Sequence, residues 1–244
     1  MNKTIVYYFT GSGNTLKVAQ RVKETFLSHG MSCELIAMED AEELVFDDVT
    51  YIGLLFPVAV QSTFPNVWAF IEGLPKTSGQ KIFMMDTMVY YSGGIVGPVK
   101  KVLKRKGYQC VGAKELKMSS SMDTKGHDEK AVIKNKLALQ EAETFVMDLL
   151  SHKTTWHRVP VLSDALRGVA RIKGIWKSMS RKKIIDNQLC VDCQVCVKRC
   201  PVNALASIDG AIKIDHDRCV SCMRCVHVCP KDAFLLSGKK VQRL

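Results

Sequence analysis

Short apolar runs alternate with amphipathic stretches over the first 150 residues of this 244-residue chain. Five apolar runs predict strands at residues 4–9, 33–37, 49–56, 81–86 and 108–118. The amphipathic stretches predict helices at residues 15–29, 40–45, 64–72, 95–106 and 128–150. Such alternation indicates an α/β fold in which helices cover both faces of a parallel sheet. Right-handed crossovers between five strands favour the doubly wound strand order 2-1-3-4-5.

A basic segment, residues 151–183, separates residues 1–150 from residues 184–244, and these three parts are the expected domain organisation. Ser163 and Asp164 are a suitable helix start, and apolar residues then recur at steps of four and three along one face. They are Ala165, Val169, Ile172, Trp176 and Met179. We expect a connecting helix that packs on one or both domains. A basic helix lying on a membrane surface is the alternative.

An internal repeat with an offset of 29 residues occupies the C-terminal part of the chain. Each copy carries four cysteines at the spacing Cys-x2-Cys-x2-Cys-x3-Cys-Pro, which begins at Cys190 in the first copy and at Cys219 in the second. Two similar halves predict a unit with pseudo-twofold symmetry. The spacing is that of the bacterial ferredoxin run, which holds iron-sulfur clusters.

A short loop around a cuboidal cluster presents three thiolates, whereas the fourth corner needs a remote donor. The fourth cysteine of each run is therefore expected to serve the other cluster. One predicted ligand set is Cys190, Cys193, Cys196 and Cys229, and the other is Cys219, Cys222, Cys225 and Cys200. A pair of zinc sites on the same thiolates is the alternative without redox chemistry. Residues 184–236 resemble a two-cluster bacterial ferredoxin, which implies a small α+β domain with two [4Fe-4S] clusters that relays one electron at a time.

A hydroxyl-rich glycine turn follows the first predicted strand and opens the first predicted helix. Its residues are Thr10, Gly11, Ser12, Gly13, Asn14 and Thr15. Backbone N–H groups and the positive end of a helix favour an anion at such a turn. The turn lacks the Gly-Lys-Ser/Thr of a Walker loop, and Leu16 stands where a dinucleotide fingerprint has its third glycine. We expect it to bind a phosphate; a capped helix start without a ligand is the alternative.

Thr10, Ser12, Gly13, Asn14 and Thr15 match the FMN phosphate loop of flavodoxins position by position, and the resemblance covers about residues 3–150. It implies a flavodoxin-like sheet with FMN at the carboxyl edge of the third and fourth strands. Two loops at that edge, residues 56–62 and 87–94, are expected to hold the isoalloxazine ring, and Tyr90 or Tyr91 would stack on it. The candidate contact residues are Phe56, Pro57 and Val58 in the first loop, and Tyr90, Tyr91, Ser92, Gly93 and Gly94 in the second.

The whole net charge of +11 lies in the C-terminal part, because residues 1–150 hold 17 basic and 17 acidic side chains and residues 151–244 hold 18 and 7. A basic surface can attract acidic proteins, anionic lipid or nucleic acid, and the composition does not choose among them; redox proteins, acidic ones included, are the expected partners. Nucleic-acid binding is not expected, and peripheral contact with an anionic membrane is an alternative. Eight of the ten cysteines stand at metal-ligand spacing, which implies a reducing compartment, while Cys33 and Cys110 are expected to pack in strands. The absence of a long apolar run and of a signal peptide predicts a cytoplasmic location.

A flavodoxin-like part followed by a two-cluster part resembles a fused flavodoxin–ferredoxin family found mainly in anaerobes. The resemblance implies an electron-transfer protein that passes single electrons between two [4Fe-4S] clusters and a bound FMN. Two alternatives stay open: a flavin-dependent oxidoreductase that acts on a small substrate with the clusters as electron input, and a cluster-based redox sensor with an empty flavodoxin-like domain. No histidine forms a pattern with a nucleophile or carboxylate, so no catalytic acid or base is assigned.

Overall fold

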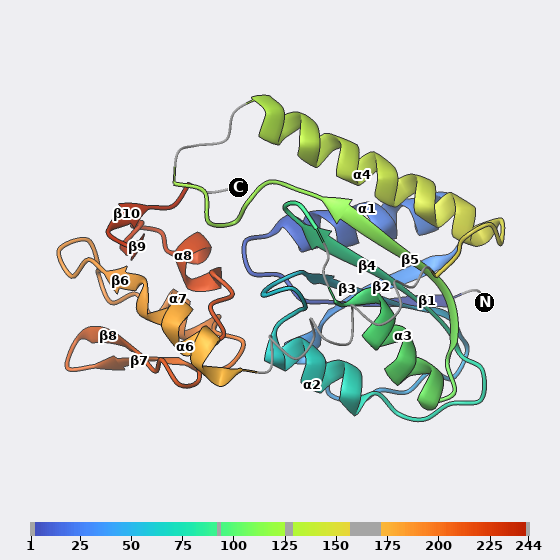
Figure 1. The fold of residues 1–244 in the computed structure, drawn as a ribbon, viewed down its shortest axis with the longest axis horizontal. Coiled ribbons are helices and arrows are strands. Elements are labelled where there is room, and N and C mark those ends of the chain that lie inside the picture. The colour runs from blue at the N-terminus through green and yellow to red at the C-terminus, as the bar shows by residue number, and fades with distance from the viewer. Residues whose placement is uncertain (1–2, 92–93, 125–128, 157–171, 243–244) are drawn as a thin grey trace.

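The computed structural model describes residues 3–91, 94–124, 129–156 and 172–242. Its larger part is a parallel sheet in the order β2-β1-β3-β4-β5, which confirms the predicted doubly wound order (Figure 1). The strands are β1 (Lys3–Tyr8), β2 (Ser32–Ala37), β3 (Val49–Pro57), β4 (Lys81–Met88) and β5 (Gln109–Lys117). Each strand begins and ends within two residues of its predicted range.

Helices cover both faces of the sheet. Successive side chains of a strand point to opposite faces, so each face has its own apolar core. Val6 of β1 belongs to the core under α1 and α4, whereas Tyr7 belongs to the core under α2 and α3 (Figure 1). Trp68 lies in the second of these cores and donates its Nε1–H to Ser62 Oγ at 3.0 Å. The helices are α1 (Asn14–Ser28), α2 (Pro65–Gly73), α3 (Val96–Arg105) and α4 (Glu129–Leu150).

The helix predicted at residues 40–45 is wrong. A single 3-10 turn, η1 (Met38–Asp40), precedes a stretch without regular structure. A segment of six residues is too short to repay the cost of nucleating a helix, and tertiary contacts decide its path instead. Phe46 packs against the edges of Tyr7 and Tyr108, with ring centroids 6.4 and 6.3 Å apart, while Val45 is exposed.

The connecting segment is described only from Ile172 onwards, so Ser163, Asp164, Ala165 and Val169 of the predicted stripe lie outside the described residues. Helix α6 (Lys173–Arg181) begins after Ile172, whose extended backbone (φ −74°, ψ 102°) interrupts the continuous helix predicted through it. Trp176 is buried and packs against Phe64 with ring centroids 5.5 Å apart. Ser180 Oγ lies 2.8 Å from His216 Nδ1, so α6 contacts both parts of the molecule.

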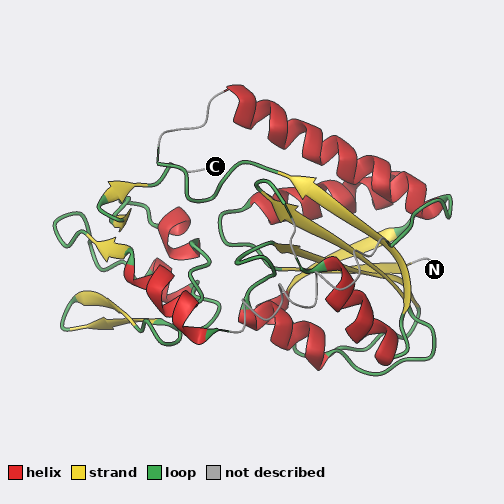
Figure 2. Ribbon diagram, in the orientation of Figure 1, coloured by secondary structure: helices red, strands yellow, loops and turns green. Residues whose placement is uncertain are grey.

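The C-terminal residues form a small α+β unit beyond the carboxyl ends of the five strands (Figure 2). At the 29-residue offset the backbone repeats itself: Asp192 and Gln194 have φ angles of 46° and 58°, and their counterparts Ser221 and Met223 have 55° and 68°. Positive φ angles are uncommon for residues other than glycine, so the two cysteine loops share one conformation. The elements are β6 (Lys183–Ile185), α7 (Val195–Lys198), β7 (Leu205–Ile208), β8 (Ala211–Ile214), α8 (Arg224–Val228), β9 (Phe234–Leu236) and β10 (Lys239–Lys240).

One carboxyl group lies fully buried inside the sheet. Asp86 of β4 has an exposed fraction of 0%, and neither of its oxygens has a hydrogen-bond partner among the described residues. Burial, and after it the charge of Glu115, raises the pKa of Asp86 well above its ordinary value. The folded protein therefore favours the uncharged carboxyl.

Asp86 should make the free energy of unfolding depend on pH. Its folded pKa exceeds its unfolded pKa, so its contribution is complete below about pH 4 and falls as the pH rises, by up to about 1.4 kcal/mol per pH unit. Asp86→Asn removes this decline, and its gain in stability over the wild type should be larger at about pH 8 than at about pH 5. Denaturant unfolding measures this, with the exposed Asp47→Asn as control. Equal gains at both pH values would contradict the assignment.

Candidate functional site

The loop between β1 and α1 forms one wall of a cavity at the carboxyl edge of the sheet. Gly13 has a left-handed backbone (φ 102°), which lets the chain turn sharply into α1. The Gly13 N–H donates to Thr10 Oγ1 at 3.0 Å and closes the turn. Because the Thr10 oxygen accepts this bond, its own O–H can still donate to a ligand.

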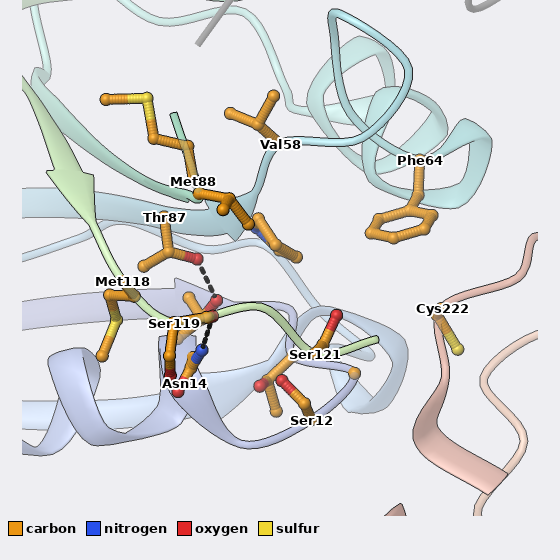
Figure 3. Close-up of a pocket in the computed structure, with 15 residues that line it drawn as sticks. Ser12, Asn14, Val58, Phe64, Thr87, Met88, Met118, Ser119, Ser121 and Cys222 are labelled. Atoms are coloured by element: carbon orange, nitrogen blue, oxygen red, sulfur yellow. Dashed lines mark hydrogen bonds between the residues drawn. The ribbon is translucent and has the colours of Figure 1, made fainter. Parts of the chain in front are cut away.

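The start of α1 is tied to the ends of two strands. Asn14 Nδ2 donates to the carbonyl of Ser119, just after β5, at 2.9 Å. The hydroxyls of Thr15 and Thr87, at the end of β4, lie 2.8 Å apart (Figure 3). Asn14 Oδ1 is buried and has no hydrogen-bond partner among the described residues. These bonds hold the polar groups of the loop in place before any ligand binds.

The cavity combines polar with apolar walls (Figure 3). The loop after β1 supplies the polar wall together with Ser119 and Ser121. The apolar wall consists of Pro57, Val58, Phe64, Met88 and Met118. Hydroxyls at a helix N-terminus favour an anion, and apolar side chains favour a flat ring system. The donor set therefore fits a ligand that carries both.

The loop after β3 is a tight turn that places two of its predicted residues at the cavity. Ala59 and Ser62 exchange backbone hydrogen bonds of 3.0 and 2.9 Å, and Gly94 N–H donates to the carbonyl of Gln61 at 2.7 Å. Pro57 and Val58 line the cavity, whereas Phe56 lies wholly in the core and does not reach it. The hydrogen bond between Gly94 and Gln61 therefore ties the turn after β3 to the loop after β4.

The structure does not bring the predicted tyrosines to the cavity. Tyr90 is 84% exposed and Tyr91 is 55% exposed, and neither lines it. Lys134 Nζ lies over the Tyr90 ring, 5.4 Å from its centroid. Met88 and Val89 line the cavity wall at which the two tyrosines were expected. Ser92 and Gly93 lie outside the described residues, so a contact of this loop with a ring stays a prediction.

The eight cysteines of the two runs gather in two groups of four. The first cysteine hollow is lined by Cys190, Cys193, Cys196 and Cys229. The second cysteine hollow is lined by Cys219, Cys222, Cys225 and Cys200. Within the described ranges, no three His, Cys, Asp or Glu side chains converge on the position of one metal ion. Each hollow combines three cysteines of one run with the fourth of the other, the grouping expected from the sequence; ligation itself stays a prediction.

A backbone N–H donates to the last cysteine of each run, and a lysine side chain donates to one cysteine of the second run. The N–H of Ala204 donates to Cys200 Sγ at 3.2 Å, and that of Ala233 donates to Cys229 Sγ at 3.4 Å. Lys183 Nζ donates to Cys219 Sγ at 2.9 Å, and Lys183 is only 5% exposed. The second hollow therefore has a buried cation at its wall.

Burial controls the protonation of these side chains. It raises the pKa of Cys225 to about 12 and that of Cys196 to about 11, so these thiols hold their protons, and metal binding must displace those protons. Burial lowers the pKa of Lys183. The negative charges that Cys225 and Cys219 carry once they are ionised, together with the hydrogen bond to Cys219, raise it by more, so the net direction is upward. The Lys183 ammonium therefore keeps its charge.

The two cysteines outside the runs pack in strands as predicted. Cys33 is buried in β2, and Cys110 is half-buried in β5. Burial raises the pKa of Cys33 to about 12 and that of Cys110 to about 11. Thiols so far from ionisation are poor nucleophiles at neutral pH.

Arg224 fastens the second cysteine run to the loop after β1. Its Nε and Nη2 donate to the Thr10 carbonyl at 3.0 and 2.8 Å, and it forms an ion pair with Glu39. Its guanidinium also lies over the Phe9 ring, 5.3 Å from the centroid. The Arg224 side chain is 13% exposed, so this charge-assisted contact is largely shielded from solvent.

Gly11 allows the backbones of the two parts to touch. A Cβ at Gly11 would stand 1.8 Å from the carbonyl oxygen of Cys222, a distance that no side chain can occupy. Cys222 lines both the cavity and the second cysteine hollow, and Figure 3 shows it across the cavity from Asn14. His227 Nε2 lies 2.9 Å from the Ser121 carbonyl and adds a further contact. The cavity and the second hollow therefore share a wall.

Several cavity residues were not predicted from the sequence. Ser119 and Ser121 belong to a run of three serines directly after β5, and this polar run at a strand end was the available signal. Phe64 and Cys222 carried no such signal, because their position depends on how distant segments pack.

None of the helices in the described ranges has both the length and the apolarity needed to cross a membrane.

Residues 183–236 match the family described as a 4Fe-4S dicluster domain. No curated protein matches the chain.

Solved structures similar in fold include flavodoxins of low sequence identity. A flavodoxin from the domain Archaea is 14% identical, covers 61% of this chain and 96% of its own, and gives a TM-score of 0.43. Flavodoxin 2 from Bacillus cereus is 15% identical, covers 61% and 98%, and gives a TM-score of 0.49. The flavodiiron protein from Giardia intestinalis is 14% identical with a TM-score of 0.41; the match covers 64% of this chain but only 38% of that protein.

The strand order of the sheet and the family match describe different parts of the chain. The chain joins an α/β sheet in the flavodoxin-like order 2-1-3-4-5 to residues 183–236, which match a 4Fe-4S dicluster domain.

Proposed function

We propose that the protein is an electron carrier that passes single electrons between two [4Fe-4S] clusters and a bound FMN, and so between redox partners. The observation that carries the proposal is the position of Cys222, which lines both the cavity and the second cysteine hollow. A flavin in the cavity and a cluster in that hollow would be neighbours. Electron transfer between two centres depends on such a short separation.

The eight cysteines hold the clusters in crossed sets. Cys190, Cys193 and Cys196 act with Cys229, and Cys219, Cys222 and Cys225 act with Cys200, because these are the side chains around each hollow. Backbone N–H groups that donate to Cys200 and Cys229 stabilise negative charge on the crossing sulfurs.

The FMN phosphate binds at the loop after β1. Thr10, Ser12 and Thr15 supply hydroxyl donors there, and α1 supplies its positive end. The apolar wall, with Val58 and Met88, suits the flavin ring and keeps water from it. Bound flavin supplies an acceptor for one or two electrons, whereas iron-sulfur clusters exchange one at a time.

The partner is a redox protein with an acidic face, and it docks near the first cysteine hollow. Cys193 at this hollow is exposed, and so is its neighbour Val191 (58%). Lys231 lines this hollow and is exposed, so it would attract acidic side chains.

A second cleft lies beside the loop after β1. Its position helps to decide whether the protein is an oxidoreductase that acts on a small substrate. This cleft runs between Asp40 and Lys198 and shares with the cavity only Thr10, Gly11 and Ser12. It therefore borders the phosphate side, whereas a substrate must reach the flavin ring to be reduced. This position favours electron transfer to a protein over chemistry on a small molecule.

Iron, acid-labile sulfide and flavin should be quantified together on one anaerobically purified sample. We expect about eight iron, about eight sulfide and about one FMN per chain. Zinc in place of iron and sulfide would contradict the clusters. A full complement of iron without releasable flavin would contradict the FMN site and favour a cluster-based sensor.

Pairs of cysteine substitutions should reveal the crossed ligation. Cys200→Ala with Cys219→Ala damages one cluster twice, so about half of the iron should remain. Cys200→Ala with Cys190→Ala damages both clusters, so little iron should remain. If each run served its own cluster, Cys200 and Cys190 would belong to the same cluster, and the two iron contents would be exchanged. Iron per chain, measured under anaerobic conditions, decides between the two patterns.

Ser12→Glu should abolish FMN retention and spare the clusters, because a carboxylate would meet the phosphate inside the turn. Affinity for FMN should fall by at least about a hundredfold, which is about 2.7 kcal/mol. Gln20→Glu, exposed further along α1, adds the same charge away from the cavity and should retain FMN. Flavin and iron per chain are the readouts, and undiminished flavin in Ser12→Glu would refute the phosphate site.

A further inference from the structure

The two halves of the internal repeat differ at one buried position beside the cysteines. Lys183 is 5% exposed, lines the second cysteine hollow and donates to Cys219 Sγ at 2.9 Å. At the 29-residue offset its counterpart is Ile212, which is also 5% exposed and lines the first cysteine hollow. The same place therefore holds a cation in one half and a hydrocarbon in the other.

A second difference lies in the cysteine loops themselves. Asp192 stands between Cys190 and Cys193, and its counterpart between Cys219 and Cys222 is Ser221. The Asp192 side chain is half-buried; its Oδ2 accepts a hydrogen bond from Ser207 at 2.9 Å. Its Oδ1 is buried without a partner in the part of the chain that the structure describes. A carboxylate thus lies in the first loop where the second has a neutral hydroxyl.

Other charges at the hollows do not cancel these differences. Lys231 lines the first hollow but is exposed, so solvent and salt screen its charge. Arg224 lines the second hollow, and its charge is paired with Glu39. Lys183 is the cation whose field acts on a hollow from a buried position, where screening is weak.

We propose that Lys183 gives the two clusters unequal reduction potentials and holds the cluster of the second cysteine hollow at the higher one. The inference rests on the proposed function. Reducing a cluster adds one negative charge, which a buried ammonium and its N–H···S hydrogen bond stabilise. Ile212 supplies neither, and Asp192 opposes that charge at the first hollow.

A single electron given to the two clusters therefore resides on the cluster of the second cysteine hollow, which lies beside the flavin cavity. The electron, supplied by a one-electron reductant, moves from the cluster of the first hollow to that of the second. The first is oxidised by one electron and the second is reduced by one electron, and no bond or proton is exchanged. The exposed side at Cys193 then receives electrons, and the side at Cys222 holds them next to the cavity.

The test is a redox titration of the full-length protein, with both clusters followed by electron paramagnetic resonance. We expect two midpoint potentials in the wild type. Lys183→Met should lower the higher one and shift the equilibrium between the clusters by at least about tenfold, which is about 59 mV for one electron. Lys182→Met, an exposed neighbour with the same change of charge, should shift neither by a comparable amount. Ile212→Lys should raise the lower midpoint and narrow the gap.

A single midpoint for both clusters in the wild type would overturn the inference. A shift in Lys183→Met no larger than that in Lys182→Met would also overturn it. If Lys183→Met fails to assemble both clusters, Ile212→Lys decides, because an unchanged lower midpoint in that variant refutes the role of the buried charge. Wild-type protein without iron and sulfide would instead refute the proposed function, and the iron assay separates the two failures.

Discussion

The loop after β1 touches the second cysteine run backbone to backbone, and this contact depends on Gly11 having no side chain. Arg224 holds the contact with two hydrogen bonds to the Thr10 carbonyl and an ion pair with Glu39. The loop that turns into α1, where we propose that the FMN phosphate binds, is therefore also the surface on which the small domain sits. One short segment of chain sets the distance between the cavity and the cysteines, and the proposed electron path follows from it.

The small domain has few apolar residues with which to stabilise itself. Its core is made in part of the cysteines Cys196, Cys225 and Cys229, packed with residues such as Phe234 and Ile212. Domains of this size often depend on a metal centre for stability. Burial keeps the thiols Cys196 and Cys225 protonated while they lack a metal, so cluster insertion and folding would be coupled. Both cysteine loops have the same uncommon backbone conformation, with positive φ angles, and a bound cluster would stabilise it.

The strands and the cysteine grouping could be predicted because each follows from a local pattern. Apolar runs bounded by polar residues define the five strands. The two cysteine runs have the same spacing, and the fourth cysteine in such a run is the one expected to join the other group. The segment 40–45 could not be predicted in this way, because contacts of Phe46 with Tyr7 and Tyr108 decide its path. The aromatic residues Tyr90 and Tyr91 look suited to a flat ligand, but the loop turns them to solvent. Phe64 and Cys222 reach the cavity through packing between distant segments, which no local pattern reports.

The central claim is that clusters and flavin exchange electrons within one chain. Rapid reduction of the clusters under anaerobic conditions, followed by the absorbance of the flavin, tests it most directly. An intramolecular path predicts flavin reduction with a first-order rate constant that stays the same over an about tenfold dilution of the protein. A rate that falls in proportion to protein concentration would show that electrons pass between separate molecules, and it would contradict the account.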